Sequence, residues 1–240
     1  MSYYNYQRMK NEQTRTYKYL DLLIIFSVMM MVITMASNGK IVKFLIFTPA
    51  ASALYFPFTY LVSDLLTEVY GFKQARRALW IMNISMVLAA LIFQLVVFLP
   101  PAPGFQGNEA FNYVLGQTPR IAIGGIIAYF VGQFLNDFVL AKMKIWTKGK
   151  YLWTRTIGST LIGQFADTSL FYLIALSNYI PANLMVPAIF SGWFLKVMVE
   201  TLMTPVTYYV VGKLKKLENE DYYDRNTNFN PLIVNLKQSG

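Results

Sequence analysis

Residues 57–77 read PFTYLVSDLLTEVYGFKQARR, an apolar helical segment with charges in its middle and at its end. Asp64 and Glu68 are four residues apart and therefore share one helical face. A glycine then interrupts the helix, and three basic residues follow within six positions. If this segment enters a bilayer, both carboxylates lie at or below the membrane surface, where a charge is costly and usually has a function.

The composition is typical of a helical membrane protein. Of the 240 residues, 55% are hydrophobic and 14% are charged, and the mean hydropathy is +0.40. Apolar runs of about 20 residues recur, which is the length needed to cross a hydrocarbon core of about 30 Å. We therefore predict an all-α membrane protein that has the lipid bilayer as its first partner.

Several chemistries are excluded by missing residue types. The chain has no cysteine and no histidine, which removes disulfides, thiolate nucleophiles, imidazole bases and the common zinc ligands. A GxxxxGK[ST] phosphate-binding loop is also absent from the sequence. We expect no enzymatic activity, no metal site and no cofactor. Two interior aspartates leave an aspartyl dyad as a minor alternative, but the Gly-x-Gly-Asp context of intramembrane aspartyl proteases is missing.

Six apolar segments divide the chain into a six-helix transmembrane domain (19–212) between an N-terminal tail (1–18) and a C-terminal tail (213–240). Pro57 is expected to kink or break the second span, and the C-terminal tail is expected to be poorly ordered after Glu218. A short apolar connector lies at about 40–49. The predicted spans are residues 19–37, 50–70, 78–99, 120–141, 156–176 and 186–212.

The basic residues predict the topology of this bundle. Seventeen of the 21 Lys and Arg fall in the two tails and in the loops after the second and fourth spans, and three fall on the opposite side. This bias places both termini in the cytoplasm. The net charge of +9 is therefore interpreted as a signal for topology and for anionic lipid head groups, and we expect no nucleic-acid partner.

Two interior motifs carry polar groups that a bilayer tolerates poorly. The fourth span contains GQFLND (132–137), which places Gln133 and Asp137 on one face, and the fifth contains GQFADT (163–168), which does the same for Gln164 and Asp167. The glycines allow close approach of the two helices. The shared Gly-Gln-Phe followed by a carboxylate hints at a repeated element.

A structural role competes with a functional one for each of these groups. Lys196 and Glu200 of the sixth span are four residues apart and can neutralise each other, which favours a structural role for that pair. Asp137 and Asp167 have no basic partner nearby on their own helices, which favours a pathway or ligand site. Arg76 and Arg77 are interpreted as topology signals, with bracing of Asp64 or Glu68 as the lesser alternative.

Such an interior suits a flat nitrogen heterocycle. Carboxylates and carboxamides match the donor and acceptor edge of a guanine-like ring, and aromatic side chains can stack on its face. The candidate binding residues are Phe56, Tyr60, Asp64, Glu68, Gln133, Asp137, Gln164, Asp167, Lys196 and Glu200. Further aromatic residues are equally compatible with packing or lipid contact, namely Phe134, Phe165, Phe171 and Trp193.

Four segments of the chain resemble the bacterial queuosine-precursor transporters, which are grouped with vitamin uptake transporters. These segments are FPFTYLVSDLLTEVYGFKQARR (56–77), AYFVGQFLND (128–137), STLIGQFADTSLFYLIAL (159–176) and WFLKVMVETLMTPVTYYVV (193–211). The resemblance implies a six-span protein of the bacterial inner membrane that takes up 7-deazaguanine bases, either a prequeuosine base with a cyano or aminomethyl group or queuine. Both tails look like additions to the family pattern.

The leading hypothesis is an importer of such a base that works by alternating access without hydrolysing ATP. The alternative is a substrate-binding membrane subunit of an energy-coupling-factor transporter, which requires an ATPase module as partner. A homo-oligomeric state is left open.

Overall fold

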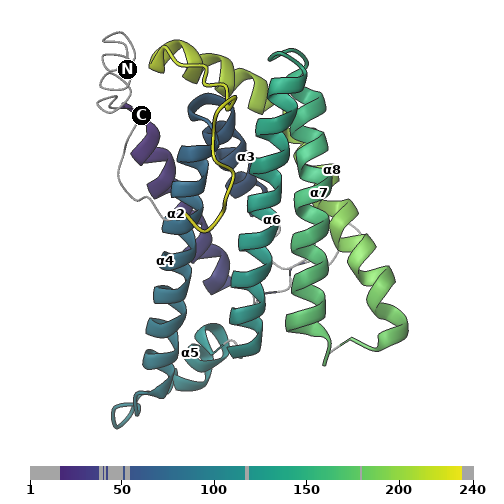
Figure 1. Ribbon diagram of the computed structural model, residues 1–240. Coiled ribbons are helices and arrows are strands. Elements are labelled where there is room, and N and C mark those ends of the chain that lie inside the picture. The colour runs from purple at the N-terminus through teal and green to yellow at the C-terminus, as the bar shows by residue number, and fades with distance from the viewer. Residues whose placement is uncertain are drawn as a thin grey trace.

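The computed structural model describes residues 17–37, 40, 42, 51, 55–116, 119–178 and 180–233 (Figure 1). Within these ranges the chain is helical and forms no strand, which confirms the all-α prediction. The helical elements are α2 (Leu20–Ser37), α3 (Pro57–Leu65), a π-helical turn (Leu66–Tyr70), α4 (Phe72–Phe98), α5 (Asn108–Leu115), α6 (Pro119–Trp146), α7 (Leu152–Phe171), a second π-helical turn (Tyr172–Leu176) and α8 (Ala182–Glu218).

Five helical segments in the described part of the chain are long and apolar enough to cross a membrane. They are Leu20–Ser37, Phe72–Phe98, the stretch Asn108–Trp146 that contains α5 and α6, Leu152–Leu176 and Ala182–Glu218. The protein is therefore a multi-pass membrane protein.

The second span is shorter in the structure than the sequence predicts, because its α-helical part begins only at Pro57. α3 and the π-helical turn after it contain 9 and 5 residues. Pro57 is the first residue of α3 and does not kink a longer helix, because the first turn of a helix needs no N–H donor at that position. The predicted connector at 40–49 lies almost wholly outside the described residues.

α3 is the centre of the bundle. It contacts α2, α6 and α8, and it lies behind α4 and α6 in Figure 1. Eight of its nine residues are buried, as are all five residues of the π-helical turn. Asp64 and Glu68 are 2% and 0% exposed, so both carboxylates lie inside the protein and not at its surface. The polar groups of α3 must consequently find their partners on the surrounding helices.

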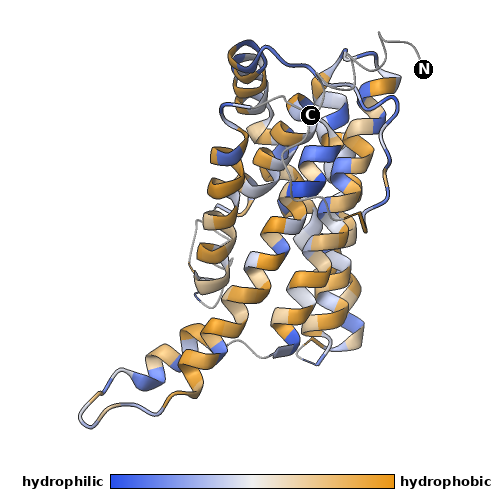
Figure 2. Ribbon diagram, turned by 60° about the vertical axis from the view of Figure 1, so that its left-hand side comes forward, coloured by the Kyte–Doolittle hydropathy of each residue, from blue (hydrophilic) through white to orange (hydrophobic). Residues whose placement is uncertain are grey.

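The outer faces of the long helices are apolar and suit a lipid environment. The second half of α4 and the short helix α5 project from the lower end of the bundle in Figure 2. Exposed side chains on this part of α4 include Leu88, Leu91, Leu95 and Phe98. α8 is bent in Figure 1, steep in its first half and shallow where it passes over the top of the bundle. Pro205 lies inside this helix and removes one of its backbone hydrogen bonds.

α6 and α7 cross at the paired glycines of the two Gly-Gln-Phe motifs. A Cβ added to Gly132 would lie 2.5 Å from the Cβ of Asp167, and one added to Gly163 would lie 2.7 Å from the Cβ of Asn136. Each glycine thus faces the residue that follows the other glycine by four positions. The repeated motif therefore produces a local two-fold relation between two antiparallel helices, and the expected close approach of the two spans is confirmed.

The C-terminal segment 219–233, which we call the strap, is ordered, and the expectation of a loose tail after Glu218 was wrong. The backbone N–H of Tyr222 donates to the carbonyl of Val69 at 3.1 Å. The Asp224 carboxylate accepts the backbone N–H of Phe72 at 3.0 and 3.1 Å. Phe72 opens α4, which has no capping side chain of its own, so the strap supplies the cap that this helix end needs.

The start of α2 and the end of α8 lie at the same end of the bundle. The backbone N–H groups of Lys18 and Tyr19, just before α2, donate to the Glu218 carboxylate at the end of α8 at 3.1 and 2.7 Å. Arg77 at the start of α4 also pairs with Asp21 of α2 at 3.2 Å.

We predict that Gly132→Ala and Gly163→Ala each destabilise the protein by about 1–3 kcal/mol, because the added methyl group forces the two backbones apart. Gly125→Ala on α6 is the matched control, since its nearest neighbour is an ordinary 3.8 Å contact with the Phe171 ring. Alanine has the higher helix propensity, so the control should be neutral or stabilising. Thermal unfolding in detergent measures all three, and equal transition temperatures would contradict the described crossing.

Candidate functional site

Four elements of the bundle direct polar side chains toward one another, and we call this group the interior polar cluster. α3 and its π-helical turn, α6, α7 and α8 all contribute to it. Its members are Tyr60, Ser63, Asp64, Thr67, Gln133, Asn136, Asp137, Thr160, Gln164, Asp167, Thr168, Lys196 and Glu200. All of them except Lys196 are buried.

Asp137 joins α3 to α6. Its Oδ1 atom accepts hydrogen bonds from the hydroxyls of Ser63 and Thr67 at 2.8 and 3.0 Å and from Gln133 Nε2 at 3.0 Å. The shared face that the sequence predicts for Gln133 and Asp137 is thus confirmed. Three donors on one oxygen stabilise a carboxylate without a basic partner.

Asp64 and Glu200 are held by neutral partners. Asn136 Nδ2 donates to Asp64 Oδ1 at 2.7 Å, and the Thr160 hydroxyl donates to Glu200 Oε1 at 2.5 Å. Sequence reasoning missed both donors. Asn136 stands beside Asp137 in the GQFLND motif, so the motif itself contained the signal.

The pairing of Lys196 differs from the sequence interpretation. Lys196 Nζ lies 2.5 Å from Asp167 Oδ2 on α7 and 5.1 Å from the centre of the Phe56 ring. The predicted neutralisation of Glu200 by Lys196 was therefore wrong. Asp167 has no basic partner on its own helix, as the sequence indicates, but it finds one on α8. On one helix, an ion pair is weaker when the lysine precedes the glutamate by four residues than when it follows. The ion pair between α8 and α7 is therefore formed instead.

Glu68 belongs to a separate ion cluster at the end of the bundle. Arg155 donates to both of its carboxylate oxygens at 2.7 and 2.8 Å, and Lys215 donates at 2.6 Å. Lys144 Nζ lies 3.6 Å from the same carboxylate. The sequence interpretation assigned these three cations only to topology, because it could not show that helix ends turn them inward.

The strap closes this ion cluster. Asp221 Oδ1 lies 2.6 Å from Lys144 Nζ and 2.7 Å from Lys215 Nζ. Burial alone acts to raise the pKa of Asp221, but the hydrogen bonds and charges of the two lysines outweigh it and lower this pKa. Arg76 does not brace Asp64 or Glu68 but donates instead to backbone carbonyls of the strap, at Asn228 and Asn230.

Within the described residues, seven buried atoms of the interior polar cluster have no hydrogen-bond partner. Five of them are carbonyl or carboxylate oxygens, and the other two are hydroxyls. Unpaired polar atoms are rare and costly in a protein interior. The atoms are Tyr60 OH, Gln133 Oε1, Asn136 Oδ1, Asp137 Oδ2, Gln164 Oε1, Thr168 Oγ1 and Glu200 Oε2. This arrangement is complementary to a ligand rich in N–H donors.

The aromatic candidates separate into two groups. Tyr60 is fully buried in the cluster, and Phe56 contacts it with ring centres 5.5 Å apart. Phe165 packs on Trp193 with ring centres 5.7 Å apart, and its side chain is 43% exposed on the outer face of the bundle. Stacking against an interior ligand is therefore open to Phe56 and Tyr60, while Phe165 and Trp193 suit packing and lipid contact.

The fold and the cluster define a multi-pass helical membrane protein with a polar interior. The family described as "Putative vitamin uptake transporter" matches residues 50–210, so the chain belongs to this family. It is a transporter family and not a family of enzymes.

Three similar proteins carry a more specific name. The Escherichia coli (strain K12) "Queuosine precursor transporter" is 31% identical over 166 residues, which cover 68% of this chain and 71% of that protein. The Bacillus subtilis (strain 168) "Probable queuosine precursor transporter" is 28% identical over 150 residues, or 62% of this chain and 66% of that protein. A Haemophilus influenzae protein of the same name is 32% identical over 125 residues, 51% of this chain and 49% of its own length. No solved structure matches the chain.

We predict that Glu68→Gln destabilises the protein by about 3–5 kcal/mol, because it leaves three cations facing one another without a buried counter-charge. Lys215→Gln should cost clearly less, since its side chain is 23% exposed and Arg155 still neutralises Glu68. Thermal unfolding of purified protein compares the two variants. Equal losses would contradict a central role of Glu68 in the ion cluster.

Proposed function

We propose that the protein imports queuosine precursors, which are 7-deazaguanine bases, across the bacterial cytoplasmic membrane. The observation that supports this most is the set of unpaired acceptor oxygens in the interior polar cluster. A guanine-like ring presents N–H donors at N1 and at its exocyclic amino group and an acceptor at O6. The names of the three similar bacterial proteins agree with such a substrate.

In this proposal, different residues recognise different parts of the base. Gln133, Gln164 and Asp137 offer unpaired oxygens to the donor edge of the ring. Lys196 is partly exposed and lies beside Phe56, so it can approach O6 when the base displaces part of its contact with Asp167. Tyr60 and Phe56 provide the aromatic face on which the ring rests.

We further propose six membrane segments with both termini in the cytoplasm and transport by alternating access. α3 with its π-helical turn would form the sixth segment, entering the bundle part of the way. The crevice between α7 and α8 leaves no room even for a water-sized molecule, whereas ligand pockets measure roughly 300–1,000 Å³. Entry of a base therefore requires the helices to move. Pro205 inside α8 and the π-helical turns after α3 and α7 are suitable hinges.

The test is uptake of a labelled 7-deazaguanine base by bacterial cells that cannot make the base and that lack an energy-coupling-factor module. We expect uptake by the parent protein and a loss of at least about tenfold, or roughly 1.4 kcal/mol, for Gln133→Ala, Gln164→Ala and Asp167→Asn.

Asn83→Ala is the matched control, because Asn83 is a buried amide on α4 with an unpaired Oδ1 atom, and α4 contributes no residue to the cluster. Membrane expression of every variant is measured in parallel. Absence of uptake by the well-expressed parent would refute the substrate, and normal uptake by all three variants would refute the site.

A further inference from the structure

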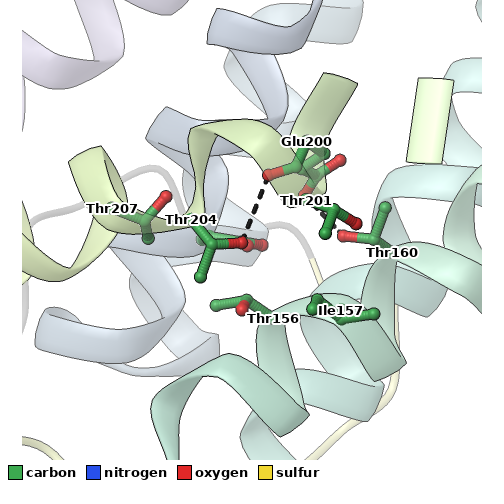
Figure 3. Close-up of a pocket in the computed structure, with 8 residues that line it drawn as sticks. Thr156, Ile157, Thr160, Glu200, Thr201, Thr204 and Thr207 are labelled. Atoms are coloured by element: carbon green, nitrogen blue, oxygen red, sulfur yellow. Dashed lines mark hydrogen bonds between the residues drawn. The ribbon is translucent and has the colours of Figure 1, made fainter. Parts of the chain in front are cut away.

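A narrow crevice lies between α7 and α8, beside α3. Two carboxyl groups line it, from Asp64 and Glu200, and the remaining lining residues apart from Ile157 are threonines (Figure 3). The threonines are Thr156 and Thr160 of α7 and Thr201, Thr204 and Thr207 of α8. The crevice leaves no room even for a water-sized molecule, so it does not admit a purine-like base, and its polar lining suits only a bare ion.

The threonine hydroxyls of the crevice all donate their hydrogen to an acceptor within the protein. Four of them donate to backbone carbonyls of their own helix, and Thr160 donates to Glu200 Oε1. On α7, Thr156 donates to the carbonyl of Trp153 at 3.1 Å. On α8, Thr201 donates to Val197 at 2.8 Å, Thr204 to Glu200 at 3.3 Å and Thr207 to Met203 at 3.3 Å. A hydroxyl that donates elsewhere presents only oxygen lone pairs to the crevice. The lining therefore attracts a cation and repels an anion.

The two carboxyl groups strengthen this preference. Asp64 is bonded to the neutral amide of Asn136. Glu200 Oε2 has no partner, although the residue is only 7% exposed. No lysine or arginine is among the residues that line the crevice. Acidic groups buried in a membrane protein without a basic partner must either take up a proton or bind a cation.

We propose that this crevice binds a sodium ion that is coupled to uptake of the base. Carboxylate and hydroxyl oxygens are hard ligands that suit alkali and alkaline-earth cations and not soft transition metals. Among the described residues no group of three or more His, Cys, Asp or Glu side chains is placed to hold a metal ion. In the proposed site the sodium ion balances one of the two carboxyl groups, and a proton neutralises the other.

The site is placed to communicate with the base. Asp64 contacts Asn136, which stands next to Asp137 in α6, and Glu200 is four residues after Lys196 in α8. A cation that draws Asp64 and Glu200 together also fixes α3 against α7 and α8, the elements that surround the interior polar cluster. The coupling, unlike the cation site itself, rests on the proposed function.

The first experiment measures binding of ²²Na⁺ to the purified full chain in detergent, with no base present and choline as the replacement ion. We expect saturable binding by the parent and a loss of at least tenfold for Glu200→Gln and Thr160→Val. Thr34→Val is the matched control, because the Thr34 hydroxyl also donates to a carbonyl of its own helix, at 2.7 Å, but lies on α2. Absence of binding by the parent, or equal binding by all variants, overturns the proposal.

The second experiment measures base uptake in sodium and in choline media at equal ionic strength. We expect at least a tenfold loss without sodium in the parent. Uptake that ignores sodium and follows a proton gradient overturns the coupling. If ²²Na⁺ binds as predicted but no base is taken up in either medium, the cation site stands and the proposed function fails, so the two failures are distinguishable.

Discussion

The structure depends on the hydrogen bonds that α3 makes to its neighbours. A bilayer offers no water to a buried carboxylate or hydroxyl, so each polar group of this short central helix must find a partner on another helix. Asp137 meets this need for Ser63 and Thr67, and Asn136 meets it for Asp64. These contacts explain how a nine-residue helix can lie at the centre of the protein while five longer segments face the lipid.

The hydrogen-bond donors and acceptors of the interior polar cluster are not matched in number, and most of the unpaired atoms are acceptors. Five of the seven unpaired atoms are pure acceptors, on Gln133, Asn136, Asp137, Gln164 and Glu200, and the other two are hydroxyls. The ion cluster around Glu68 shows that the same chain can satisfy a buried carboxylate completely when it only has to hold helices together. The unpaired acceptors of the interior polar cluster therefore suit a role in recognition, with a donor-rich base in the cluster and a small cation in the crevice beside it.

Sequence reasoning could predict features that depend on spacing within one helix. It predicted the helical class, the close approach of the Gly-Gln-Phe motifs and the shared face of Gln133 and Asp137. It could not predict the partner of Lys196, because that choice depends on how α8 is rotated against α7. The inward orientation of Arg155 and the order of the strap could not be predicted for the same reason. Both depend on contacts between segments that are far apart in the chain. The tyrosines and Phe229 in the strap were the available signal.

The most direct measurement of the central claim uses the absence of cysteine from the chain. Thr168 is 1% exposed, and its hydroxyl is one of the unpaired atoms of the interior polar cluster. A Thr168→Cys variant should react with a small methanethiosulfonate reagent as the helices move, and a 7-deazaguanine base should slow that reaction at least tenfold. A cysteine in place of Leu91, on the lipid face of α4, should be unaffected by the base. Reaction at Thr168→Cys that is indifferent to the base, or no reaction at all, would contradict a reachable polar interior that binds the base.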